Sequence, residues 1–121
     1  MAKQGEFNHI EFPADDTQRA TTFYTNVFGW QFRAMDGYDD YYLYTAGPGE
    51  LGGGIGKRGV NAPDQVRNYL AVDSIEDTIA RVEANGGSVV TPKTDIGFGW
   101  YAAVTDTEGN ELGIYRAKSD G

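Results

Sequence analysis

The spacing of hydrophobic residues predicts two amphipathic helices. Between residues 16 and 28, apolar side chains recur at every third or fourth position, at Ala20, Phe23, Tyr24, Val27 and Phe28. Asp15 or Asp16 can cap the start of this helix, and Gly29 can end it in a left-handed conformation.

A second helix is predicted to begin at Ser74. Ser74 and Asp77 have the spacing of a capping box. The apolar stripe that follows consists of Ile75, Ile79 and Val82. The glycine pair at positions 86 and 87 is expected to end this helix. The two predicted helices therefore match in length and in the residues that begin and end them.

Each predicted helix is preceded by one strand-like segment and followed by three more. The first half has these segments at residues 7–12, 30–34, 41–46 and 51–57, and the second half has them at residues 67–72, 88–91, 100–105 and 111–116. Turn sequences, 47–49 and 106–109, separate the last two strands of each half. Each half is therefore predicted to be a β-α-β-β-β unit.

The two halves of the sequence are similar to each other. Residues 9–16 align with residues 67–74, and Gly29 then falls on Gly87. Such a repeat predicts two copies of one unit, module one at residues 5–59 and module two at residues 66–117, with a linker at 58–66. Because each half alone would be marginally stable, we expect the 121 residues to form a single domain, residues 1–121.

Charge and composition exclude several classes of function. Eighteen acidic and ten basic residues give a net charge of −8, which disfavours binding to nucleic acids and anionic membranes. No segment approaches the ~18 apolar residues of a membrane helix. The absence of cysteine excludes disulfides and thiolate nucleophiles, and the N-terminus does not resemble a secretory signal. We therefore expect a soluble, cytoplasmic protein.

Three segments together resemble the vicinal oxygen chelate superfamily, which includes glyoxalases, bleomycin-resistance proteins and extradiol dioxygenases. They are "HIEFPADD" with "FYTNVFGW" in module one, "YLAVDSIEDTIARVEANGGSVVTPKT" in module two, and the closing "GWYAAVTDTEGNELGIY". The resemblance implies an α+β fold in which two β-α-β-β-β modules form a cupped, barrel-like mixed sheet with the helices outside. It also implies a homodimer.

The resemblance further implies a test for a metal site, because the metal enzymes of this superfamily take one ligand from the first and one from the last strand of each module. The first-strand positions fall on His9 and Arg67, and arginine has no lone pair to give. The last-strand positions fall on Gly113 and on Gly52 or Gly53. One standard ligand of four survives, so a divalent metal is possible but not supported, although Glu11, Glu50 or Glu111 could substitute. No other cofactor is indicated.

His9 has three interpretations: a remaining metal ligand, a general base, or a histidine packed in the core. Strand alternation places Glu11 on the same face, where its carboxylate could orient the imidazole ring and raise its basicity. We therefore treat His9 and Glu11 as candidate catalytic residues. Arg67 is expected to face inward and to form an ion pair, for instance with Glu11, or to bind an anionic group of a ligand.

Several aromatic residues are candidates for binding a ligand. Tyr69 and Tyr115 share strand parity with Arg67 and Gly113, and Trp100 lies in a glycine-rich stretch that allows close approach. Tyr42 is a further candidate, although core packing is the usual fate of aromatic side chains. The glycines of "GPGELGGGIGKRG" twice satisfy G-x-G-x-x-G, but no helix is predicted after them, so we expect them to leave room for a ligand or a crossing chain.

Two functions fit these observations. The first is a protein that binds a small organic molecule in an aromatic-lined cup without the standard four-ligand metal site. The second is a lyase or isomerase related to the glyoxalases, in which His9 acts as a base or residual metal ligand.

Overall fold

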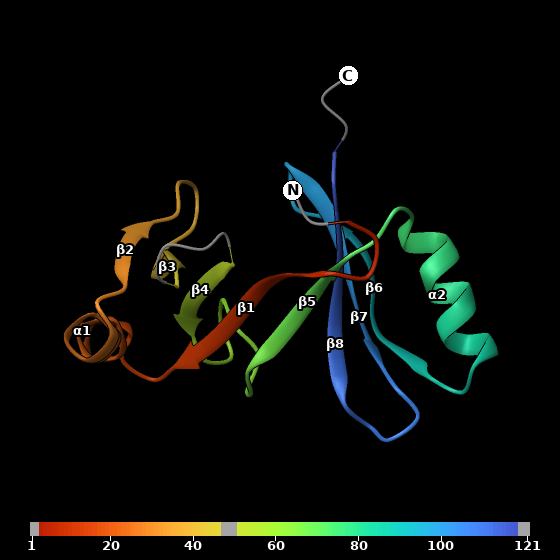
Figure 1. Cartoon of the computed structure of the whole chain (residues 1–121), viewed down its shortest axis with the longest axis horizontal. Coiled ribbons are helices and arrows are strands. Elements are labelled where there is room, and N and C mark those ends of the chain that lie inside the picture. Colours follow the sequence, from red (N-terminus) through yellow and green to blue (C-terminus); the bar gives the residue numbers. More distant parts are fainter. Residues whose placement is uncertain (1–2, 47–50, 119–121) are drawn as a thin grey trace. The chain divides into compact units, whose positions relative to one another are not determined.

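The computed structural model describes residues 3–46 and 51–118. Its elements form the two predicted β-α-β-β-β modules (Figure 1). Module one contains β1 (Phe7–Ala14), α1 (Thr17–Phe28), β2 (Gln31–Ala34), β3 (Tyr41–Thr45) and β4 (Gly52–Lys57). Module two contains β5 (Arg67–Ala71), α2 (Ile75–Ala84), β6 (Ser88–Asp95), β7 (Gly99–Thr105) and β8 (Glu111–Ala117). The α+β class is confirmed.

The chain contacts divide into two compact units, residues 8–67 and the remaining residues, which follow the module boundaries closely. Between the modules, the predicted linker contains no helix and only an isolated bridge between Arg58 and Ala62. The turn predicted at 47–49 and the neighbouring Glu50 lie outside the described residues. No helix in the described part of the chain is long and apolar enough to cross a membrane.

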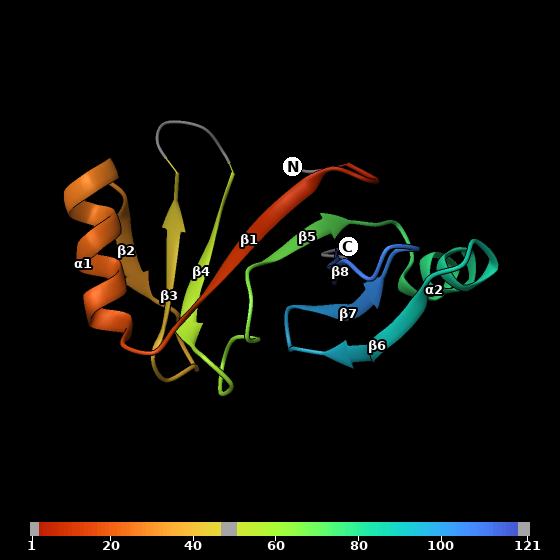
Figure 2. The ribbon, with the colours of Figure 1, turned by 90° about the horizontal axis from the view of Figure 1, so that it is seen from below.

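Both modules have a mixed sheet with the same pairing pattern. In module one, β1 pairs with β4 in parallel, and β4, β3 and β2 then pair antiparallel. In module two, β5 pairs with β8 in parallel, and β8, β7 and β6 follow antiparallel. Figure 2 shows each helix alongside the strands of its own module.

The helix ends form as predicted. Asp16 caps α1 by accepting a hydrogen bond from the Arg19 backbone N–H at 3.0 Å, and Gly29 ends the helix with φ of 76°. Ser74 caps α2 through the backbone N–H of Asp77 at 3.1 Å. These polar caps satisfy backbone groups that the helices themselves cannot pair.

The helix side of each sheet carries its hydrophobic packing. In module two, the core consists of Val72, Ile75, Ala102, Val104 and Ile114. In module one, the indole of Trp30 stacks on the rings of Tyr44 and Tyr24, at 4.4 Å and 4.9 Å between centroids. Aromatic packing therefore attaches α1 to its sheet.

The predicted apolar stripe of α1 is only partly buried. Tyr24 packs against Phe12 and Trp30, whereas Phe23, Val27 and Phe28 are each more than half exposed. The predicted helix is confirmed, but its apolar spacing does not mean that the sheet covers every apolar side chain. The rings of Phe23 and Phe28 nevertheless contact the Tyr24 ring, so these two side chains are packed along one edge and exposed along the other.

The glycines of β4 make room for a side chain of their own module. Tyr41 of β3 pairs with Gly56, and its ring lies over Gly54 and Gly56. A Cβ atom on Gly56 would lie 2.8 Å from Tyr41 Cδ2, and one on Gly54 would overlap the ring and its hydroxyl. Neither the ligand nor the crossing chain predicted from the sequence is what fills this space.

Gly54→Ala is predicted to lower the free energy of unfolding by about 1–3 kcal/mol, because the added methyl group overpacks the site of the Tyr41 ring. Urea unfolding of the variant tests this. The same substitution in a Tyr41→Ala background should cost much less, since the ring is then gone. Equal costs in the two backgrounds would show that the ring does not require the glycine.

Candidate functional site

Three ionisable side chains of module one form a continuous hydrogen-bonded group. The Tyr41 hydroxyl lies 3.0 Å from Nε2 of His9 and donates to Oε2 of Glu11 at 2.6 Å. His9 and Glu11 lie two residues apart on β1, and Tyr41 comes from β3. We refer to these three residues as the His9–Tyr41–Glu11 group.

The strand register explains why this group is buried. Glu11 pairs with Gly54, and Tyr41 pairs with Gly56, so two positions without side chains lie beneath the phenol ring. Glu11 and Tyr41 are each only 7% exposed. A buried carboxyl group is costly unless it is hydrogen-bonded, and the Tyr41 hydroxyl supplies such a bond.

Burial also controls the protonation of His9. Desolvation lowers the pKa of His9 from 6.5 to about 4, because the charged imidazolium loses its hydration. The imidazole is therefore neutral at neutral pH. A base with so low a pKa is poorly matched to proton abstraction under those conditions.

The sequence placed His9 and Glu11 on one face, and the structure shows both in contact with the same hydroxyl. Tyr41 was missed, although it lies between them. Pairing the predicted strands 41–46 and 51–57 as a hairpin would have set Tyr41 opposite a glycine of β4. A large side chain facing residues without side chains was the available signal.

Tyr42 and Trp100, both predicted to bind ligand, lie on the helix sides of their sheets. Tyr42 pairs with the fully buried Ile55, and its hydroxyl accepts a hydrogen bond from Gln18 of α1. Trp100 packs against the core of module two under the ammonium groups of Lys93 and Lys118. Strand alternation puts Tyr41, not Tyr42, on the face that carries Glu11.

The other predicted ligand-binding residues belong to the opposite face of module two from its core. Tyr69 pairs with Gly113 and covers it with its ring, and Tyr115 pairs with Tyr101. Burial raises the pKa of Tyr115. Arg67 is partly buried and opens β5, two residues before Tyr69.

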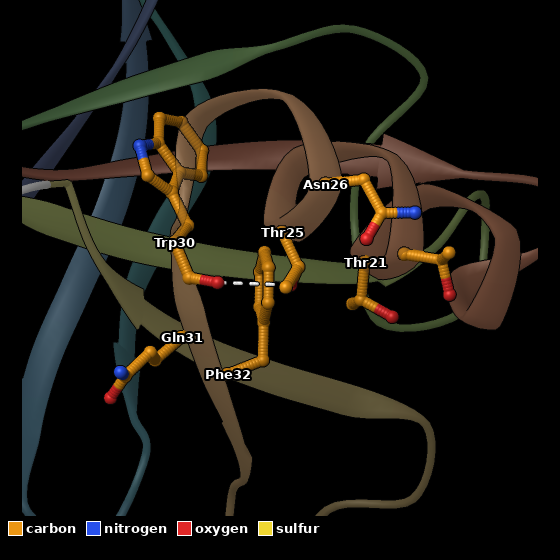
Figure 3. A pocket seen from close by; sticks show the side chains of 7 residues that line it. Thr21, Thr25, Asn26, Trp30, Gln31 and Phe32 are labelled. Carbon is orange, nitrogen blue, oxygen red and sulfur yellow. Dashed lines mark hydrogen bonds between the residues drawn. The ribbon is translucent and has the colours of Figure 1, made fainter.

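A separate open groove of about 410 Å³ lies between α1 and β2 (Figure 3). Its lining residues are Thr21, Thr22, Thr25, Asn26, Trp30, Gln31 and Phe32. The Thr25 hydroxyl donates to the backbone carbonyl of Trp30 at 2.9 Å, and the indole already stacks on two tyrosines. The groove has no ionisable side chain, so the His9–Tyr41–Glu11 group is the stronger candidate site.

Comparison with known proteins identifies the family. The model of the Glyoxalase/Bleomycin resistance protein/Dioxygenase superfamily matches residues 6–114. The chain belongs to this superfamily.

Individual relatives agree with this membership. A glyoxylase-like domain-containing protein of Didymella fabae is 31% identical over 94% of the chain and 95% of its own length. CFP32 of Mycobacterium tuberculosis, which carries a provisional glyoxylase name, is 30% identical over 95% of the chain. The chain spans only about half the length of CFP32, 47%.

A solved structure supports the fold. The structure of a hypothetical protein from Bacillus halodurans C-125 superposes with a TM-score of 0.74 at 14% identity, covering 98% of this chain and 99% of that one. At this identity the likeness shows the superfamily fold and not a shared activity.

The residues of this superfamily member do not fit a four-ligand divalent cation. Gly113 pairs with Tyr69, the counterpart of Glu11, and Glu11 itself pairs with Gly54. The last-strand position of module one is therefore Gly54 and not Gly52 or Gly53 as predicted, and neither Gly54 nor Gly113 has a ligating side chain. Tyr41 lies between His9 and Glu11. Within the described ranges, no three His, Cys, Asp or Glu residues are grouped to hold a metal ion, and Glu111 is exposed.

Acid is predicted to destabilise the protein partly through His9. Between pH 6.5 and about 4 the unfolded chain binds a proton that folded His9 does not, so stability falls as the pH drops through this range. The full loss, reached below pH 4, is about 3 kcal/mol. Urea unfolding at several pH values should show a flatter dependence for His9→Gln than for the wild type.

The comparison with His9→Gln isolates the histidine from other acid-labile groups. The pKa values of Glu76 and Asp95 are lowered mainly by hydrogen bonds from Lys93 and from the Gly97 backbone, respectively. These carboxylates contribute equally to both proteins. Identical pH profiles would mean that His9 titrates normally in the folded state.

Proposed function

We propose that this superfamily member binds a small organic molecule next to the His9–Tyr41–Glu11 group, without a four-ligand metal site. One observation carries this proposal: the Tyr41 hydroxyl joins the two potential metal ligands of β1, while its ring covers Gly54. Side chains that would otherwise hold a cation are thereby part of a buried hydrogen-bonded group.

The chemistry of this group suits recognition by hydrogen bonds and ring contacts. The imidazole is neutral, the tyrosine hydroxyl is held by His9 and Glu11, and the glycines beneath the ring let it pack closely against the strand. Such pre-organised polar groups beside aromatic surface are typical of small-molecule sites. Arg67, Tyr69 and Tyr115 remain proposed ligand-binding residues, whereas Tyr42 and Trp100 leave the proposal because they face the helices.

A second candidate function is a glyoxalase-related lyase or isomerase with His9 as the base. Two relatives have glyoxylase names, which supports this candidate. The lowered pKa of His9 counts against it, because a neutral imidazole with pKa about 4 accepts protons weakly at neutral pH. We place the enzyme second to the binding protein because the pKa of His9 is lowered.

The assembly and location expected from the sequence are part of the same proposal. A homodimer, a cytoplasmic location and the absence of nucleic-acid partners stay predictions. The net charge of −8 supports the last of them.

Ligand-observed NMR with a library of small carbonyl and aromatic compounds tests the binding function. We expect hits whose binding persists in the presence of a chelator and weakens at least tenfold in Tyr41→Phe and His9→Gln, equivalent to a loss of about 1.4 kcal/mol. Tyr42→Phe is the matched control, because Tyr42 is the neighbouring tyrosine on the opposite face of the sheet. It should leave affinity unchanged.

The same compounds distinguish the alternative. Incubation in deuterated water would reveal an enzyme by incorporation of deuterium next to a carbonyl, abolished in folded His9→Gln. Binding that disappears with the chelator, or hits that bind His9→Gln and Tyr41→Phe as tightly as the wild type, would contradict the proposed function.

A further inference from the structure

The position of the Tyr41 hydroxyl is fixed from several sides. The phenol ring lies on β4 over Gly54 and Gly56, and Tyr41 is 7% exposed. The hydroxyl is in hydrogen-bonding distance of both His9 and Glu11. A tyrosine held in this way has little freedom to change partners.

A count of protons determines the direction of both hydrogen bonds. A tyrosine hydroxyl has a single hydrogen, and Tyr41 donates it to Glu11 Oε2 at 2.6 Å. The distance is that of a short bond to a carboxylate oxygen. The contact of 3.0 Å with His9 must then use a lone pair of the Tyr41 oxygen, so His9 is the donor and Nε2 carries its proton.

We propose that Tyr41 is a positioning residue that fixes neutral His9 in the Nε2–H tautomer, and that Glu11 sets this direction through the Tyr41 hydroxyl. Nδ1 is then the nitrogen of the ring with the lone pair. Any proton that His9 accepts enters at Nδ1, and Nε2–H can serve a ligand only if its bond to Tyr41 breaks.

The assignment concerns the protein without ligand, so it holds whether or not the proposed binding function is correct. It adds a role for Glu11 that its place on β1 alone does not reveal. Glu11 accepts the proton of the same hydroxyl that contacts the imidazole ring, and it thereby determines which nitrogen of the ring is the donor.

The chain has one histidine, so NMR of uniformly ¹⁵N-labelled protein reports on His9 alone. At neutral pH, long-range ¹H–¹⁵N spectra should show one tautomer, with a protonated Nε2 and an unprotonated Nδ1. The Nε2 proton should be visible and protected from exchange. If the wild-type spectrum shows an unprotonated Nε2, or ring nitrogens averaged between two tautomers, the proposal is refuted without any variant.

Variants of Tyr41 and Glu11 then test which residues determine the tautomer of His9. Tyr41→Phe should lose the protected Nε2 proton and give averaged ring nitrogens, whereas Tyr42→Phe should match the wild type. Glu11→Gln allows the opposite direction, with the amide donating to Tyr41 and Tyr41 donating to His9, so the Nε2–H population should fall. Unchanged histidine spectra in folded Tyr41→Phe or Glu11→Gln would refute the role of that residue.

Discussion

The hydrogen bond between Tyr41 and Glu11 is the constraint on which the candidate site depends. Glu11 is the one acidic or basic side chain among the buried described residues, and a buried carboxyl group without a partner would cost several kcal/mol. The hydroxyl that contacts it comes from β3, so the Tyr41 side chain must reach across β4, the strand between β3 and β1. The glycines of β4 make that possible, because they let the Tyr41 ring lie flat against the strand.

The two modules use the same strand pairing to carry different side chains. In both modules the last strand has a glycine at the same pairing position, Gly54 or Gly113, and a tyrosine ring covers it. In module one the ring comes from β3, which leaves the first-strand position to Glu11. In module two the ring belongs to the first-strand residue itself, Tyr69. The two modules thus share the pairing of the glycine and the ring above it, whereas the His9–Tyr41–Glu11 group belongs to module one.

Much of the fold was predictable from the sequence, because periodicity, caps and the repeat all point the same way. The cap at Ser74 and the left-handed Gly29 formed as expected. The site was less predictable, since its residues depend on strand register and on which face each side chain occupies. Tyr41 and Tyr42 are adjacent in the sequence, yet one contacts Glu11 and the other Gln18. Exposure of Phe23, Val27 and Phe28 also escaped prediction, because helical periodicity cannot tell how wide a stripe the sheet covers.

The central claim is that the Tyr41 hydroxyl and the Glu11 carboxyl group stabilise each other inside module one. The most direct measurement is their coupling energy from the unfolding free energies of the wild type, Tyr41→Phe, Glu11→Leu and the double variant. The predicted coupling is about 1–3 kcal/mol, as for a buried hydrogen bond to a charged group. Additive effects of the two substitutions would contradict the account.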